Sequence, residues 1–137
     1  MAHVLVIDDD EAVTGTFARM LQTDGHEVTS ATGAAEGLRH ANARRPDAVI
    51  LDIRMPAVDG VEFLRSLRQN PRTAGVPVAV VTGDYFVQDS VLRELDQLHA
   101  IVRYKPLWMA DMSALVEALL GPAAHPAASK AKAGADR

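Results

Sequence analysis

The sequence contains no cysteine, which excludes disulfide bridges, thiolate nucleophiles and thiolate metal sites. A bound metal would have to rely on oxygen or imidazole ligands, and the five histidines are scattered without the spacing of a zinc site. No window reaches the roughly 18 consecutive apolar residues of a membrane span, and the start does not resemble a signal peptide. We therefore expect a cytoplasmic protein that makes no membrane contact.

Basic residues are not concentrated into a face that could bind a phosphate backbone. The formal net charge is −4, and Lys130, Lys132 and Arg137 all lie in the last stretch of the chain. The rest of the chain is therefore more acidic than the total suggests. Since nucleic-acid binding needs a concentrated basic surface, we expect no direct nucleic-acid contact. The first apolar run is followed by acids and has no glycine-rich turn, which argues against a dinucleotide site.

Short apolar runs rich in valine and isoleucine alternate with longer stretches of helical spacing. Strands are expected at residues 4–7, 26–30, 48–51, 76–81 and 100–104. The apolar pattern predicts that four of these five strands are buried on both faces. A helix over residues 33–44 is favoured by alanine-rich propensity as much as by spacing. Strands joined by helical crossovers predict a parallel sheet with helices on both faces, a doubly wound (βα)5 fold of the α/β class.

The length of 137 residues suits one domain with a sizeable core. We expect that domain to cover residues 1–121. Residues 122–137 are rich in alanine, proline and lysine and offer little to bury. They are predicted to form a disordered tail or a linker to a further domain, and the sequence leaves both alternatives open.

Acidic and polar residues stand directly after four of the apolar runs. These residues are Asp8, Asp9 and Asp10 after the first run, Asp52 after the third, Thr82 after the fourth and Lys105 after the fifth. Ligands of a doubly wound sheet bind beyond the carboxyl ends of its strands, so these side chains are expected to meet at one edge. One acid suffices to cap a helix, and we assign that role to Asp10.

A carboxylate such as Asp52 can accept a phosphoryl group and form an acyl phosphate when Mg²⁺ screens the negative charges. Asp9 and Asp52 can supply metal oxygens directly, while Asp8 can orient a metal-bound water. Thr82 offers a hydroxyl donor and Lys105 a positive charge to the oxygens of the transferred group. The pattern therefore predicts a phosphoryl-accepting, Mg²⁺-binding site.

Four segments, in this order along the chain, carry a family resemblance: Val4-Leu5-Val6-Ile7-Asp8-Asp9-Asp10, Asp52-Ile53-Arg54-Met55-Pro56-Ala57-Val58-Asp59-Gly60, Val80-Val81-Thr82-Gly83 and Tyr104-Lys105-Pro106. Together they resemble the response-regulator receiver domains of two-component signalling, over about residues 3–120. The resemblance implies a flavodoxin-like fold with a five-stranded parallel sheet in the order 2-1-3-4-5. It also implies a cytoplasmic phosphoprotein that is phosphorylated on Asp52 by a sensor histidine kinase or a histidine phosphotransfer protein.

The resemblance further implies a protein that catalyses its own phosphorylation and dephosphorylates slowly, rather than a classical enzyme. Its signal would pass to a downstream protein by contact or by phosphorelay. The backbone carbonyl of Arg54 is expected to bind Mg²⁺, and Arg54 and Asp84 are expected to pair across the mouth of the site. Gly83 is expected to leave room for the phosphodonor, and Pro106 to follow a cis peptide bond.

Val102 departs from the family pattern. It stands three residues before Lys105, where the family has a tyrosine or phenylalanine whose rotamer couples to the threonine. A valine cannot sweep between buried and exposed positions, so the relay is expected to depend on Thr82 and its loop. The nearest aromatic residue, Tyr104, is expected to point to the other face of the sheet.

Output is expected on the face formed by residues 87–97, 100–104 and 109–120, as the resemblance implies. Trp108 lies close to this face, and we expect it to pack the last helix onto the core.

Two alternatives remain beside this interpretation. A pseudo-receiver would keep the fold as an interaction module without using phosphate. The absence of the family's aromatic residue at Val102 is consistent with that alternative. An aspartyl-phosphate hydrolase of the haloacid-dehalogenase type needs an acid two residues after its nucleophile, where this sequence has Arg54. The joint presence of the acids with Thr82 and Lys105 favours the phosphate-using receiver.

Overall fold

Five parallel strands form one sheet in the order β2-β1-β3-β4-β5. The computed structural model describes residues 2–8, 10–53, 57–83, 89–105 and 107–124, with backbone alone at 13, 52, 53, 57–59 and 122–124. The strands are β1 (His3–Ile7), β2 (Glu27–Ala31), β3 (Ala48–Ile53), β4 (Val78–Thr82) and β5 (Ala100–Tyr104). The helices are α1 (Glu11–Thr23), α2 (Ala34–Ala43), α3 (Ala57–Gln69), α4 (Asp89–Gln97) and α5 (Met109–Ala124). The predicted fold class and strand order are confirmed.

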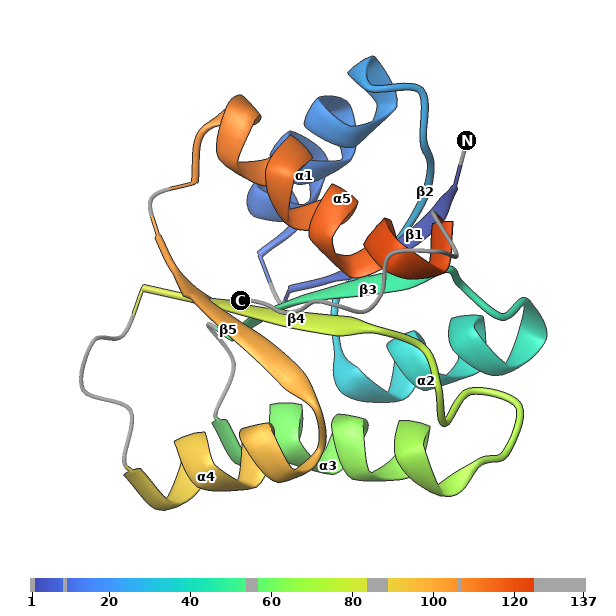
Figure 1. The fold of residues 1–137 in the computed structure, drawn as a ribbon, viewed down its shortest axis with the longest axis vertical. Helices are drawn as coiled ribbons and strands as arrows, with labels where there is room; N and C mark the ends of the chain where they lie inside the picture. Colours follow the sequence, from blue (N-terminus) through green and yellow to red (C-terminus); the bar gives the residue numbers. More distant parts are fainter. Residues whose placement is uncertain (1, 9, 54–56, 84–88, 106, 125–137) are drawn as a thin grey trace.

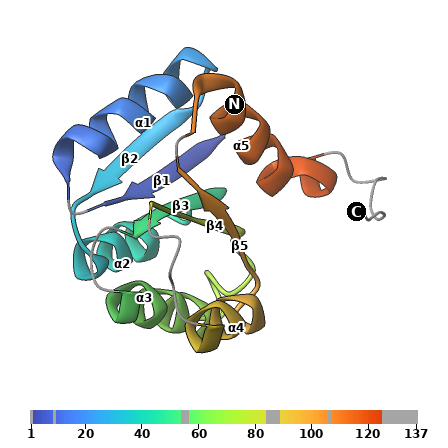
Figure 2. The same cartoon turned by 90° about the vertical axis from the view of Figure 1, so that its left-hand side faces the viewer.

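The sheet lies between two layers of helices, with α1 and α5 on one face and α2, α3 and α4 on the other (Figures 1 and 2). Successive strand residues point to opposite faces, so each strand contributes to two cores. On β1, Val4 and Val6 join the core beneath α1 and α5, whereas Leu5 and Ile7 join the core beneath the other three helices. This burial on both faces explains the continuous apolar runs of the central strands.

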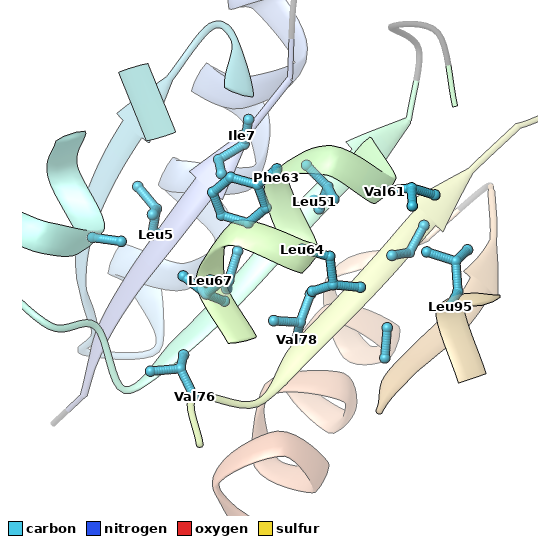
Figure 3. Packing of buried hydrophobic residues seen from close by; sticks show 14 of the residues in the cluster. Leu5, Ile7, Leu51, Val61, Phe63, Leu64, Leu67, Val76, Val78 and Leu95 are labelled. Carbon is cyan, nitrogen blue, oxygen red and sulfur yellow. The ribbon is translucent and has the colours of Figure 1, made fainter. Parts of the chain in front are cut away.

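The second of these cores is built around Phe63 of α3, whose side chain is fully buried. Figure 3 shows its ring against Ile7 and Leu51 of the sheet. Gly37 of α2 lies on the same cluster, and a Cβ atom there would come within 2.5 Å of Ile7 Cδ1 and 3.3 Å of Phe63. The helix predicted over 33–44 therefore needs a glycine where it approaches the sheet.

The expectation that four strands are buried on both faces is wrong, because neither β2 nor β5 is buried along its whole length. β1 and β4 are buried along their whole length, but Arg103 and Tyr104 at the end of β5 are exposed. β5 comes last in the strand order, so a strand flanks it on one side alone within the described part of the sheet. Fewer neighbouring residues therefore cover the side chains at the end of this edge strand.

Asp10 and Trp108 each stand directly before a helix. Asp10 is the N-cap of α1, and its Oδ1 accepts a hydrogen bond of 2.9 Å from the Ala12 N–H, as predicted. Trp108, directly before α5, is 69% exposed, so the prediction that it packs the last helix onto the core is wrong. Its backbone N–H donates to Asp111 Oδ2 at 2.9 Å. This bond forms where α5 begins and leaves the indole ring outside the core.

The last helix, α5, reaches Ala124 and has non-helical backbone angles at Gly121. Residues 125–137 lie outside the described residues, so the division into a domain over 1–121 and a tail over 122–137 stays a prediction. In the part of the chain that the structure describes, no helix has the length and apolar character needed to cross a membrane.

His3 is a buried histidine at the amino end of β1, and it has 7% of its surface exposed. Its Nε2 lies 2.7 Å from Thr29 Oγ1. Burial lowers the pKa of His3 from its usual value, and the positive charge of Arg44 lowers it further, against smaller opposite effects of Glu27 and Asp47. The folded protein therefore favours the neutral imidazole.

The free energy of unfolding is expected to fall as the pH drops below about 6.5, because the unfolded chain then binds a proton at His3 that the folded chain resists. The loss continues until the pH reaches the lowered folded pKa. Urea unfolding at about pH 7.5 and about pH 5.5 measures this effect. A His3→Gln variant should lose less stability than the wild type between these two pH values. Equal losses would contradict the assignment to His3.

Candidate functional site

The carboxyl ends of the strands bring several predicted site residues to one edge. β1 and β3 pair Ile7 with Leu51, so Asp8 lies beside Asp52, one residue further along. β3 and β4 pair Ile53 with Thr82, which places Thr82 next to the end of β3. The strand register thus joins three of the predicted positions across neighbouring strands, although they are distant in sequence.

Asp8 is a carboxylate without solvent exposure. Its backbone N–H donates to the Ala31 carbonyl at 3.1 Å, and its Oδ1 accepts from the Asp10 N–H at 3.0 Å. A buried carboxylate is costly unless hydrogen bonds or a cation offset its charge. Asp8 therefore fits a site for a hard cation such as Mg²⁺, which prefers oxygen ligands.

Thr82 and Lys105 are joined through their backbones. Thr82 is 1% exposed, and its carbonyl accepts a hydrogen bond of 2.9 Å from the Lys105 N–H. Lys105 is half-buried, and its Cδ would lie 3.8 Å from a Cβ atom added at Gly83. The methylene chain of Lys105 therefore runs alongside Gly83. A hydroxyl and an ammonium group can both donate hydrogen bonds to an anion at this edge.

Several predicted site residues lie outside the described residues: Asp9, Arg54, Asp84, Pro106 and the side chain of Asp52. Among the side chains that the structure describes, no group of three or more histidines and acids is close enough to hold a metal ion. The predicted metal ligands, the Arg54–Asp84 pair and the cis bond before Pro106 therefore stay predictions.

Val102, the position of the expected switch, is partly buried and packs against the core beneath α2, α3 and α4. The register pairs it with Val80 of β4 and pairs Tyr104 with Thr82. Residues two apart on a strand share a face, so Tyr104 lies on the same side as Val102, and the expectation that it points to the other face is wrong. Sequence reasoning missed Tyr104 as a site neighbour, although counting along β5 could have found it.

The edge therefore combines a buried carboxylate with a hydroxyl and an ammonium group, around the position of a second acid. Oxygen ligands on one side suit a divalent cation, and donors on the other suit the oxygens of an anion. An anionic ligand held between them would be in contact with both kinds of group. This chemistry suits a phosphoryl group bound with a metal ion.

Comparisons with known proteins agree with this arrangement. A family model described as "Response regulator receiver domain" matches residues 4–102. The transcriptional regulatory protein PrrA of Mycobacterium tuberculosis is 41% identical over 118 residues, which are 86% of this chain and 49% of PrrA. Protein PilH of Pseudomonas aeruginosa is 34% identical over 82 residues, which are 60% of this chain and 68% of PilH.

A solved structure of the chemotaxis protein CheY4 of Vibrio cholerae superposes with a TM-score of 0.79 at 26% sequence identity. The match covers 88% of this chain and 99% of the CheY4 chain. A receiver domain protein of Clostridium thermocellum superposes with a TM-score of 0.78 at 28% identity, over 92% of this chain and 99% of that one. The chain spans about half the length of PrrA, 49%, but nearly all of these shorter structures.

Proposed function

This chain belongs to the response-regulator receiver domain family, and we propose that Asp52 is the residue on which it accepts a phosphoryl group. The observation that carries the proposal is the strand register at the carboxyl edge. It sets Asp52 beside the buried acid Asp8, and the strand that contains Asp52 pairs directly with the strand that ends at Thr82. Accepting a phosphoryl group is the function of this family, and Asp52 is the acid at the centre of the edge.

In the proposed reaction, a carboxylate oxygen of Asp52 attacks the phosphorus atom of the phosphodonor. The bond between phosphorus and the donor's leaving atom breaks, and an acyl phosphate forms on Asp52. The Thr82 hydroxyl donates to one phosphoryl oxygen, and the Lys105 ammonium neutralises another. Both groups hold the phosphoryl group where the strands β4 and β5 end.

Mg²⁺, when bound, screens the charges that the acid and the phosphoryl group bring together. The proposed ligands are the carboxylates of Asp9 and Asp52 and the backbone carbonyl of Arg54, and Asp8 would orient a metal-bound water. The buried carboxylate of Asp8 supports this assignment. We also propose that Arg54 and Asp84 limit water at the mouth of the site and slow autodephosphorylation, and that the absence of a side chain at Gly83 leaves room for the donor.

The proposed donor is a sensor histidine kinase or a histidine phosphotransfer protein in the cytoplasm. The output is proposed to be contact with a downstream protein or transfer in a phosphorelay, with no direct nucleic-acid binding by this domain. Relatives such as PrrA are named as transcriptional regulators, and PrrA is about twice as long as the part matched here.

Incubation with acetyl phosphate tests the proposed function. Intact mass is expected to increase by one phosphoryl group when Mg²⁺ is present, and to stay unchanged when EDTA removes it. The adduct should disappear on treatment with hydroxylamine, which cleaves acyl phosphates. A chain that forms no adduct with Mg²⁺ would instead be a pseudo-receiver, and an adduct that forms equally without Mg²⁺ would contradict the proposed metal site.

A further inference from the structure

We propose that Tyr104 is a positioning residue that covers Thr82 and keeps water from the phosphoryl group, and so sets how long the phosphorylated form lasts. This inference rests on the proposed function of Asp52. It gives β5 a role in the reaction besides the contribution of Lys105.

The strand register places Tyr104 directly beside Thr82. These two residues are the last of β5 and β4, and the register pairs them. Neighbouring strands lie about 4.8 Å apart, and paired residues of parallel strands project to the same face. The backbone bond from the Lys105 N–H to the Thr82 carbonyl, 2.9 Å long, holds the two strand ends together. The side chains of Tyr104 and Thr82 therefore start from paired backbone positions on the same face of the sheet.

The burial of Thr82 needs a cover at this point. Thr82 is 1% exposed although it ends its strand and the following residue, Gly83, is exposed. Tyr104 is 40% exposed, so its side chain is partly covered by the protein and partly open to solvent. Val102 lies two residues earlier and pairs with Val80, which puts it about 6.6 Å further from the edge. Tyr104 is thus the large side chain of β5 at the level of Thr82.

The reaction that limits the phosphorylated form is hydrolysis. A water oxygen attacks the phosphorus atom, the bond between phosphorus and the Asp52 oxygen breaks, and inorganic phosphate leaves with the restored carboxylate behind. The attacking water releases its proton to the phosphate or to solvent. An apolar ring beside Thr82 reduces the water that can reach the phosphorus from the β5 side. The cover needs the ring and not its hydroxyl group.

The experiment compares the decay of the phosphorylated form in three variants. Tyr104→Val keeps a strand-forming residue but removes the ring, Tyr104→Phe keeps the ring, and Trp108→Ala removes a neighbouring aromatic that is 69% exposed. Each chain is phosphorylated with acetyl phosphate and Mg²⁺ and separated from the donor, and its intact mass is followed over time. Urea unfolding checks that each variant is folded.

We expect Tyr104→Val to lose its phosphoryl group about threefold to tenfold faster than wild type, a change of about 1 kcal/mol in the barrier. Tyr104→Phe and Trp108→Ala should decay at the wild-type rate. A Tyr104→Val decay equal to wild type would overturn the proposal while leaving the role of Asp52 intact. Equally fast decay in Tyr104→Phe would overturn the assignment to the ring. Absence of an adduct in the wild type would overturn the proposed function itself.

Discussion

An Asp52→Asn variant incubated with acetyl phosphate and Mg²⁺ is expected to show no phosphoryl adduct in its intact mass, whereas the wild-type chain gains one phosphoryl group. The amide of asparagine is a poor nucleophile and cannot form the acyl phosphate. Asparagine has nearly the same shape as aspartate, so the loss would not come from a change in packing. We expect the adduct to fall below detection, which is the largest effect that any single substitution in this chain should have on phosphorylation.

A matched control separates the acceptor from acids in general. Asp96 is an exposed acid of α4, so Asp96→Asn makes the same chemical change away from the carboxyl edge. Asp96→Asn should be phosphorylated like the wild type. An adduct that persists in Asp52→Asn would place the acceptor on another residue, and fragmentation of the modified chain would then locate it.

Much of this site could be predicted from the sequence because strand ends are marked by local pattern. A buried parallel strand appears as an unbroken apolar run, and the first polar residue after it marks the carboxyl edge. Asp8 and Thr82 were found in this way, and both lie buried at that edge. The capping role of Asp10 follows from the same local rule, since an acid before a helix satisfies its first N–H groups.

The features that escaped prediction depend on which elements become neighbours. The apolar run of β5 resembles that of a central strand, yet its place at the end of the sheet order leaves Tyr104 exposed. Trp108 was expected to be buried because a large aromatic residue usually is, but the turn into α5 leaves it 69% exposed. Neither outcome is encoded within a few residues of the position concerned.

Arg68 is a further feature that no sequence pattern marked. This residue of α3 donates from Nε to the Leu98 carbonyl at 2.8 Å, and from one terminal nitrogen to the carbonyls of Ala74 at 2.9 Å and Val76 at 2.5 Å. Burial lowers the pKa of Arg68 from its usual value, but a guanidinium stays charged in proteins. One half-buried cation thus joins the end of α3 to the segments before β4 and β5.

Replacing Arg68 with leucine is expected to lower the free energy of unfolding by about 3 kcal/mol. Leucine fills part of the volume but leaves the carbonyls of Leu98, Ala74 and Val76 without the donor that they have in the folded chain. Each such loss costs about 1–3 kcal/mol before water partly replaces the bonds. Arg68→Lys should fall between, because one ammonium group cannot span the acceptors that a planar guanidinium reaches.

Urea unfolding of Arg68→Leu, Arg68→Lys and Arg93→Leu measures this difference. Arg93 is an exposed arginine of α4, so its replacement should change stability by less than about 0.5 kcal/mol. If Arg68→Leu is as stable as Arg93→Leu, then solvent replaces the three bonds and Arg68 does not stabilise the fold.

If the variant is destabilised as expected, the amino ends of β4 and β5 are held by this side chain. The carboxyl ends of the same two strands present Thr82 and Lys105, so a loosened pairing of β4 and β5 should also slow phosphorylation of Asp52 in Arg68→Leu.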